Sequence, residues 1–318
     1  MSAKPEVSYE SLPVPPAEAP DILSPPGWAM ELVEAGRRLR SYSCANGLEV
    51  SGYDREAFAL ASVRIPGATR LDASALQQRV TQAYNAIAEM IRPLAARHPV
   101  RLWNHIPAIH QRMDDRRDRY MVFNAGRYEA FAQWYGGAGA FDQNIATASG
   151  IGHTGQELVI HCLSANQPGL SVENPRQIAP HRYSERFGPL PPCFARATVL
   201  HEIGLVLVGG TASIFGEDSR HRASLPMQMG ETLTNLATVV ERAHALVRAV
   251  SKRDESEWLR SYRDVRVYFP RAGDDDAIEA MVRPAFEASC RVEFRHADLC
   301  RAELLVEIEG VAQLERKP

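Results

Sequence analysis

Long apolar runs, surplus basic charge and paired cysteines are all scarce in this sequence. The apolar runs, such as residues 203–210, are far shorter than the roughly 20 residues that cross a bilayer, so we expect no membrane segment. The formal net charge is −3, which leaves no surplus of Lys and Arg to neutralise phosphates or anionic lipid. Nucleic acid and membrane surfaces are therefore poor candidates for partners.

The patterns of several common enzyme classes are also missing. The five cysteines are scattered without a CxxC pair, which favours free thiols over a disulfide framework or a zinc knuckle. The glycine-rich run at residues 209–213 is neither a P-loop nor a dinucleotide fingerprint, and no GxSxG elbow occurs. His201-Glu202-Ile203-Gly204 begins like a zinc-protease helix but lacks the second His. We expect no metal site there.

The N-terminus has little periodic pattern. Its first 26 residues contain seven prolines, which is typical of an arm on the surface or of a disordered segment. They lack the basic start and apolar block of a secretory signal, so we expect a cytoplasmic protein. The remaining chain is long and apolar enough for one large domain or two of ordinary size.

What is present is a repeated order of strands and helices, which predicts an α/β (α+β) fold with mixed sheets. Asp72 caps a helix whose apolar positions, from Leu76 to Leu94, recur at helical spacing. The other elements predicted in the first half are strands at 47–65, 100–106 and 157–163 and a helix at 120–134. The second half repeats this order, with strands at 197–209, 265–269 and 302–309 and helices at 229–250 and 275–288.

Short residue echoes between the halves indicate an internal duplication. Arg101-Leu102-Trp103 answers Arg266-Val267-Tyr268, and segment 157–161 answers segment 303–307. In the second echo Glu307 stands where the first half has His161. Two similar units usually pack together with a cleft where they meet, so we expect a binding site between them.

Glu307 is the candidate general acid. Alternation along the last predicted strand places Glu303, Leu305, Glu307 and Glu309 on one face. That face is either solvated or part of the cleft, and in a cleft desolvation would raise the pKa of Glu307 enough to hold a proton near neutral pH. Cys300, seven residues earlier, is either an ordinary buried thiol or reaches the same cavity.

Arginines in aromatic and proline-rich segments are a second clue. Arg127, Arg182, Arg186 and Arg196 lie in such segments, and a guanidinium can bind a carboxylate through two parallel hydrogen bonds. Arginines beside Tyr would suit an aromatic or cyclic acid. The alternative is ordinary surface arginine.

Several strings together resemble the chorismatase family, over residues 45–312. They are the segments 123–127, 182–189, 194–197 and 297–301, the last leading into 306–309. Segment 209–213, the helix with Glu231, Thr232 and Asn235, and the ending 305–309 together resemble the RidA (YjgF) fold. Chorismatases are similar in fold to the imine deaminases of the RidA (YjgF) type. The resemblance implies two RidA/YjgF-like units with helices on one face of each sheet.

The resemblance also implies a division of the chain. Residues 1–44 would be a Pro-rich arm and 45–165 the first unit. Residues 166–193 would connect the units and contribute substrate-binding residues. Residues 194–318 would form the second unit, which carries the catalytic glutamate.

The family's activity is the cleavage of chorismate to pyruvate and a cyclic or aromatic acid. By resemblance, Glu307 would protonate the enolpyruvyl group, and Cys300 would direct the product to 3-hydroxybenzoate, with 4-hydroxybenzoate as well in members of the xanthomonadin type. The implied substrate-binding residues are Arg127, Tyr183, Arg196, Thr211 and Ala212. No metal or organic cofactor is needed, because the acid is an ordinary side chain.

Three alternatives stay open. The first is chorismate hydrolysis to a dihydroxycyclohexadiene carboxylate. The second is a RidA-type enamine or imine hydrolase, against which the doubled unit argues. The third is a binding protein without turnover. The partner expected is the small molecule chorismate, and the protein would be a monomer or a small homo-oligomer.

Overall fold

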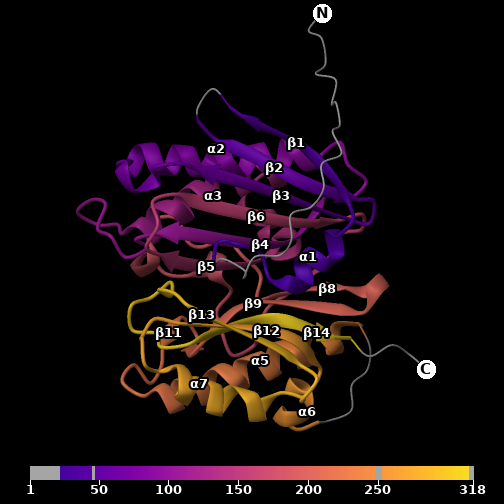
Figure 1. Cartoon of the computed structure of the whole chain (residues 1–318). Coiled ribbons are helices and arrows are strands. Elements are labelled where there is room, and N and C mark those ends of the chain that lie inside the picture. The colour runs from indigo at the N-terminus through magenta and orange to yellow at the C-terminus, as the bar shows by residue number, and fades with distance from the viewer. Residues whose placement is uncertain (1–21, 45–46, 248–252, 315–318) are drawn as a thin grey trace, which may run out of the picture.

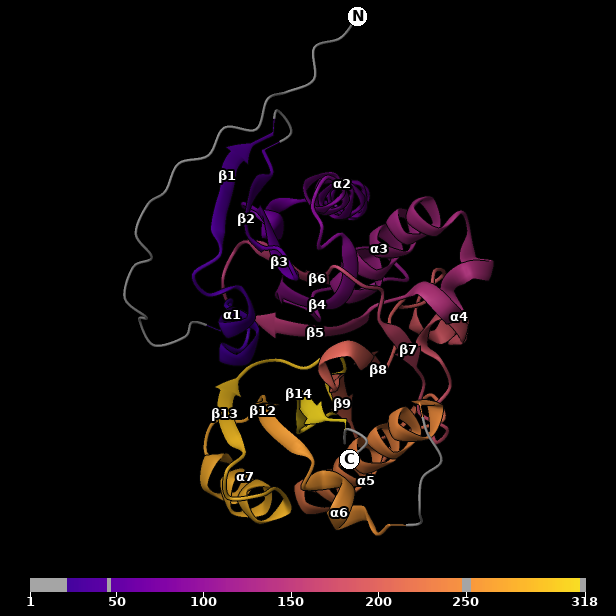
Figure 2. The same ribbon diagram turned by 90° about the vertical axis from the view of Figure 1, so that its right-hand side faces the viewer.

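Two mixed sheets of six strands lie face to face in the computed structural model, which describes residues 22–44, 47–247 and 253–314. Helices cover the outer side of each sheet, so the molecule has the layer order helix, sheet, sheet, helix (Figure 1). Figure 2 shows the same layers after a quarter turn, with the two units one above the other. The mixed α/β fold predicted from the sequence is confirmed.

The first sheet comes from the N-terminal half, in the order β1-β2-β3-β6-β4-β5. Its strands are β1 (Arg37–Ser43), β2 (Glu49–Arg55), β3 (Phe58–Ile65), β4 (His98–Pro107), β5 (Thr147–His153) and β6 (Leu158–Ala165). The helices of this half are α1 (Gly27–Val33), α2 (Ala73–Ile91), α3 (Arg119–Tyr135) and α4 (Phe141–Asn144).

The second sheet comes from the C-terminal half, in the order β13-β12-β14-β9-β8-β7. Its strands are β7 (Leu170–Val172), β8 (Ala197–Leu200), β9 (Leu205–Ala212), β12 (Tyr262–Phe269), β13 (Arg291–His296) and β14 (Glu307–Gln313). The helices are α5 (Leu225–Val247), α6 (Glu255–Leu259) and α7 (Asp275–Val282), and a small hairpin joins β10 (Ile214–Phe215) to β11 (Asp218–Ser219).

The two sheets have the same topology, which supports the duplication. In each unit the third strand pairs antiparallel with the last strand, which means β3 with β6 and β9 with β14. The fourth strand pairs parallel with the fifth, which means β4 with β5 and β12 with β13. The residue echoes fall into register as well. Trp103 pairs with His161 in the first sheet, and Tyr268 pairs with Glu307 in the second. His161 and Glu307 are therefore equivalent positions, as the sequence predicted.

Each unit has its own core, and a third apolar cluster joins the units. In the first unit, α2 and α3 pack on the sheet through side chains such as Val80, Tyr84 and Phe131. Asp72 caps α2 as predicted, because its side chain accepts a hydrogen bond of 2.8 Å from the Ala75 N–H, a contact worth about 1 kcal/mol. Trp103 lies in the third cluster, between the two sheets.

Two predicted boundaries need correction. The last strand begins at Glu307 and not at 302, because the preceding backbone is bonded to a buried glutamine: Gln228 donates to the Glu303 carbonyl at 2.9 Å and accepts from the Leu305 N–H at 2.8 Å. The helix at 275–288 ends at Val282, and Pro284 explains the end, since its ring removes a backbone donor and restricts the residue before it.

The strand predicted at 197–209 is also interrupted. A 3-10 turn at His201–Ile203 separates β8 from β9, and Gly204 has a positive φ of 67° that closes the turn. His201 and Glu202 lie exposed on this turn and not on a helix. The other 3-10 turns are at Ala68–Arg70, Ala138–Ala140, Pro180–Arg182, Glu185–Phe187 and Arg283–Ala285.

The predicted N-terminal arm is only partly described, since residues 1–21 lie outside the described residues. Residues 22–26 pack between the units, which corrects the expectation of a surface arm for this part. The Leu23 carbonyl is 2.7 Å from Nε2 of His161, and Arg266 donates to the Ser24 carbonyl at 2.8 Å. Residues 27–43 add α1 and the edge strand β1. Across the described ranges, no helix has both the length and the apolar character needed to cross a membrane.

Candidate active site

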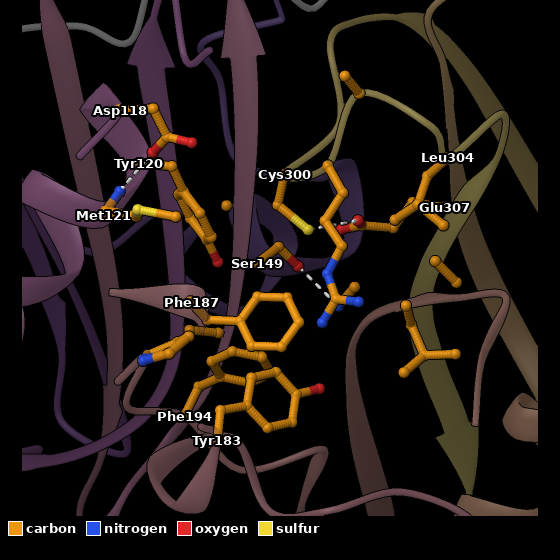
Figure 3. A pocket seen from close by; sticks show the side chains of 18 of the residues that line it. Asp118, Tyr120, Met121, Ser149, Tyr183, Phe187, Phe194, Cys300, Leu304 and Glu307 are labelled. Atoms are coloured by element: carbon orange, nitrogen blue, oxygen red, sulfur yellow. Dashed lines mark hydrogen bonds between the residues drawn. The ribbon is translucent and has the colours of Figure 1, made fainter. Parts of the chain in front are cut away.

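A cavity of about 380 Å³ lies where the two units meet. The first unit contributes Tyr120 on α3 and Ser149 on β5, and the second contributes Ala212 on β9 and Glu307 on β14. The connecting segment contributes the aromatic rings of Tyr183 and Phe187, and Phe194 follows at the start of the second unit. The three rings point into the same space (Figure 3). The site therefore needs both units and the segment between them.

Glu307 stands at the first position of β14 and is 3% exposed, so the solvated alternative is excluded. An added Cβ on Gly210 would lie 1.9 Å from Glu307 Oε1, so only glycine leaves room for this carboxyl group. The Gly209-Gly210 pair stands where the register between β9 and β14 shifts. The glycines that the sequence singled out thus bring the backbone of β9 close to Glu307.

The surroundings of Glu307 favour its protonated form. Burial raises the pKa of this carboxyl group to about 8, and the neighbouring charge of Glu309 adds to the rise, whereas Arg101, Arg196 and Arg301 oppose it. Because the pKa lies above neutral pH, Glu307 carries a proton that it can donate. This is the property required of a general acid.

Cys300 lies beside the acid, with Sγ 4.0 Å from Glu307 Oε2 (Figure 3). Burial, and then the charge of Glu307, raise the pKa of the Cys300 thiol to about 12. The thiol is therefore neutral at physiological pH, which makes it a poor nucleophile.

Two buried arginines face the cavity without a carboxylate partner. Arg127 is 1% exposed and donates to Asn124 Oδ1 at 2.8 Å, and Arg196 is 6% exposed and donates to the Tyr183 hydroxyl at 2.7 Å. No acidic side chain of the described residues forms an ion pair with either of them. Glu173 interacts electrostatically with Arg196 but forms no ion pair with it. Both guanidinium groups therefore keep the capacity to bind an anionic ligand.

Arg301 is a lining residue that the sequence analysis did not select. Its guanidinium lies 4.1 Å from the ring centroid of Phe187 and 5.6 Å from that of Tyr183, and it donates to the Glu217 carbonyl at 2.8 Å. Arg301 ends the segment 297–301, which resembles the chorismatases. It was not selected because its contacts join segments more than 80 residues apart, which local sequence does not reveal. Tyr120 was also missed, because its place in the first turn of a helix gave no functional signal.

Six of the seven predicted site residues line the cavity: Arg127, Tyr183, Arg196, Ala212, Cys300 and Glu307. Thr211 does not line it. Alternation along β9 turns its side chain to the other face of the sheet, where the hydroxyl donates to the Gly209 carbonyl at 2.9 Å. We therefore remove Thr211 from the proposed binding residues. Arg182 also lies outside, exposed and paired with Asp142, while Arg186 lines the cavity.

A buried network adjoins the acid. Glu309 is 1% exposed and accepts hydrogen bonds from Arg101 Nη2 at 2.6 Å, from Trp103 Nε1 at 3.0 Å and from the Tyr268 hydroxyl at 3.1 Å, and it also accepts from Ser149. Trp103 and Tyr268 come from different units, so the network ties the two sheets together beneath the cavity.

Metal chemistry has no evident ligands in this structure. Within the described part of the chain, no three His, Cys, Asp or Glu side chains gather as they would around a metal ion. The fold and the cavity define a class of two-unit α/β protein in which a carboxyl group of raised pKa and buried arginines line one cavity between the units.

Known proteins agree with this class. The family described as "Chorismatase FkbO/Hyg5-like, N-terminal" matches residues 41–164. A 3-hydroxybenzoate synthase of Streptomyces hygroscopicus is 33% identical over 236 residues, which are 72% of this chain and 67% of that relative. A chorismatase of Streptomyces rapamycinicus is 30% identical over 72% of this chain and 68% of its own. The chain belongs to the chorismatase family, which is a family of enzymes.

A solved chorismatase structure agrees on the fold. A chorismatase crystal structure superposes with a TM-score of 0.74 at 25% identity, over 87% of this chain and 80% of that one. A Rid-family protein, YyfA from Yersinia pestis, matches 46% of the chain with a TM-score of 0.34. The resemblance on which the sequence analysis relied is confirmed.

Proposed function

We propose that this enzyme cleaves chorismate to pyruvate and 3-hydroxybenzoate, with Glu307 as the general acid. One observation carries the proposal: a buried carboxyl group with a pKa of about 8 stands in a cavity with two arginines that lack a carboxylate partner among the described residues. The printed name of the 3-hydroxybenzoate synthase relative supports the choice of product.

The cavity suits the proposed substrate. Chorismate carries two carboxylates, an enol ether to a pyruvyl group and a cyclohexadiene ring with a hydroxyl. Arg127 and Arg196 would bind the carboxylates through two parallel hydrogen bonds each, and Tyr183 would hold the Arg196 guanidinium in place. Phe194, whose ring lies 5.6 Å from the Arg127 guanidinium and 5.3 Å from that of Arg196, would pack against the ring of the substrate.

The proton of Glu307 begins the reaction. Transfer to the methylene carbon of the enolpyruvyl group produces an oxocarbenium-like centre. The ring hydroxyl then forms a bond to the neighbouring ring carbon as the ether bond breaks, and pyruvate leaves as a ketone. The hydroxyl proton returns to the Glu307 carboxylate, and the arene oxide opens to the aromatic acid. Chorismate is thus divided into the two products without added water.

Cys300 would favour this route over hydrolysis. Its neutral sulfur fills the space beside Glu307, where a water molecule would have to stand to add to the pyruvyl carbon. A smaller side chain would admit that water and give the dihydroxycyclohexadiene carboxylate instead. The choice between the two products is therefore assigned to one side chain.

The proposal is tested by incubating the purified protein with chorismate and following pyruvate release, with chromatography to separate 3-hydroxybenzoate, 4-hydroxybenzoate and the dihydrodiol. We expect pyruvate and 3-hydroxybenzoate in equal amounts. Glu307→Gln should abolish turnover and leave chorismate binding largely intact. Absence of pyruvate from the wild-type reaction would reject the activity, and retained turnover in the variant would reject the acid.

A further inference from the structure

Glu309 occupies an unusual position for a carboxylate that takes no part in the proposed proton transfer. It follows Glu307 by two residues on the same strand and lies in the dry layer between the sheets. Its donors come from β4 and β5 of the first unit and from β12 of the second. Such a group is fixed in place by its hydrogen bonds, one of which is part of an ion pair with Arg101.

Arg101 is the only cation among the donors. It is 0% exposed, and its Nη2 lies 2.6 Å from Glu309 Oε2. The same nitrogen donates to Ser149 Oγ at 2.6 Å, and Ser149 Oγ in turn accepts from the Gly210 N–H at 2.9 Å. Gly210 is the residue against which the Glu307 carboxyl group lies. The ion pair is therefore linked through Ser149 to Gly210, the residue beside the acid.

We propose that Glu309 is a positioning residue whose negative charge cancels that of Arg101 and so keeps the proton on Glu307. The inference rests on the proposed function, since it concerns the same acid. Without Glu309, the Arg101 cation would stand alone in the interior beside Glu307. The Glu307 carboxyl group would then lose its proton and replace Glu309 as the counterion.

Other charges around the acid do not take over this role. The titratable and charged groups nearest to Glu307 are Glu309 on the same strand, Arg101 on β4, Tyr268 on β12, Tyr120 on α3, Arg196 before β8, and Cys300 and Arg301 before β14. His110, Asp118, Arg127, Arg186 and Glu303 line the same cavity. Arg196 and Arg301 line the cavity, so substrate carboxylates can neutralise them. Arg101 does not line the cavity, and its charge is left to Glu309.

The experiment is the pH profile of kcat for Glu309→Gln, which keeps the shape of the side chain and removes its charge. In the wild type, activity should fall as the pH rises through about 8, where Glu307 loses its proton. An uncompensated cation lowers the pKa of a nearby carboxyl group by roughly 1 to 3 units. We expect the apparent pKa of the alkaline limb to fall by about that amount in the variant, with kcat at pH 8 reduced about fivefold or more and recovery at lower pH.

Matched variants separate charge from packing. Arg101→Gln combined with Glu309→Gln removes both charges, and the alkaline limb should return close to the wild-type position although two more buried contacts are lost. Tyr268→Phe removes a neutral hydrogen bond to Glu309 Oε1 and should leave the limb where it is. A role in packing alone predicts that the double variant is no better than the single one.

Several outcomes would overturn the inference. One is an unshifted limb in Glu309→Gln, and another is a double variant shifted as far as the single one. If Glu309→Gln does not fold, Arg101→Gln is tested alone. The apparent pKa of its alkaline limb must equal or exceed that of the wild type, and a lower value rejects the proposal. Retained turnover in Glu307→Gln would instead show that the proposed acid itself is wrong.

Discussion

Gly210 and Glu307 stand so close that an added Cβ on the glycine would lie 1.9 Å from the carboxyl oxygen Oε1. No real pair of atoms tolerates that distance without a bond. Gly210→Ala must therefore push the Glu307 carboxyl group away from its place over β9. Because a displacement of about 1 Å in a reacting group can cost about a hundredfold in rate, we expect kcat to fall by that order.

The control for this prediction is Gly230→Ala. Gly230 lies on α5, and an added Cβ there meets nothing within 4 Å. That variant should keep its activity and gain up to about 1 kcal/mol of stability, since Ala is a better helix former. Steady-state kinetics and thermal unfolding of both variants check the prediction, and normal kcat in Gly210→Ala would contradict the placement of Glu307.

The product should depend on Cys300. Cys300→Ala opens space beside the Glu307 carboxyl group, 4.0 Å from the present sulfur, and should shift the product mixture toward the dihydrodiol while pyruvate release continues. Cys44→Ala is the matched control, because Cys44 is a free thiol that does not line the cavity. Chromatography of the acid products measures the ratio, and an unchanged ratio in Cys300→Ala would refute the assigned role.

The raised pKa of Glu307 should also appear in the stability of the fold. Between its ordinary pKa of 4.5 and its folded value of about 8, the folded state binds a proton that the unfolded state does not. The contribution to stability is complete below the lower value and is lost as the pH rises through this window, to an extent on the order of 5 kcal/mol.

The Glu307→Gln variant has no carboxyl group to ionise at this position. The difference between its unfolding free energy and that of the wild type should therefore increase steadily from pH 5 to pH 8. Denaturant unfolding at several pH values gives this difference. A constant difference across the range would show that Glu307 is ionised in the folded enzyme, contrary to the assignment of the proton.

Substrate binding should depend on the buried arginines rather than on the exposed ones. Removing one partner of a buried charged contact costs about 2 to 5 kcal/mol of binding, so Arg196→Gln should raise KM for chorismate by a factor of about 30 or more. Arg182→Gln is the control, because Arg182 is exposed and pairs with Asp142 outside the cavity. Equal KM values for the two variants would place the substrate carboxylates elsewhere.

The sequence predicted well where local pattern decides the structure. The helix from Asp72 follows from its cap and its apolar spacing, and the equivalence of His161 with Glu307 follows from the echoes. β5 was missed, because its short glycine-containing sequence lacks the pattern of a strand and forms one only by pairing with β4. Residues 150–155 match the spacing G-x-G-x-x-G. They are not a dinucleotide fingerprint, because they end one strand and lead through a turn into another strand rather than into a helix.

The candidate site shows the same limit. Glu307 could be selected from alternation along residues 302–309, but residues 302–306 of that range form no strand. The role of Glu309 could not be predicted, since its partner Arg101 is 208 residues away along the chain. Long-range contacts of this kind exist only once the two units have packed together.

The N-terminal segment has a consequence for stoichiometry. Duplication left two equivalent positions, Glu307 in one unit and His161 in the other, and backbone from residues 22–26 lies against His161. We therefore expect one substrate molecule per chain. Calorimetric titration of Glu307→Gln with chorismate should saturate at one equivalent per chain, whereas saturation at two equivalents would show that the terminal segment gives way to a second molecule.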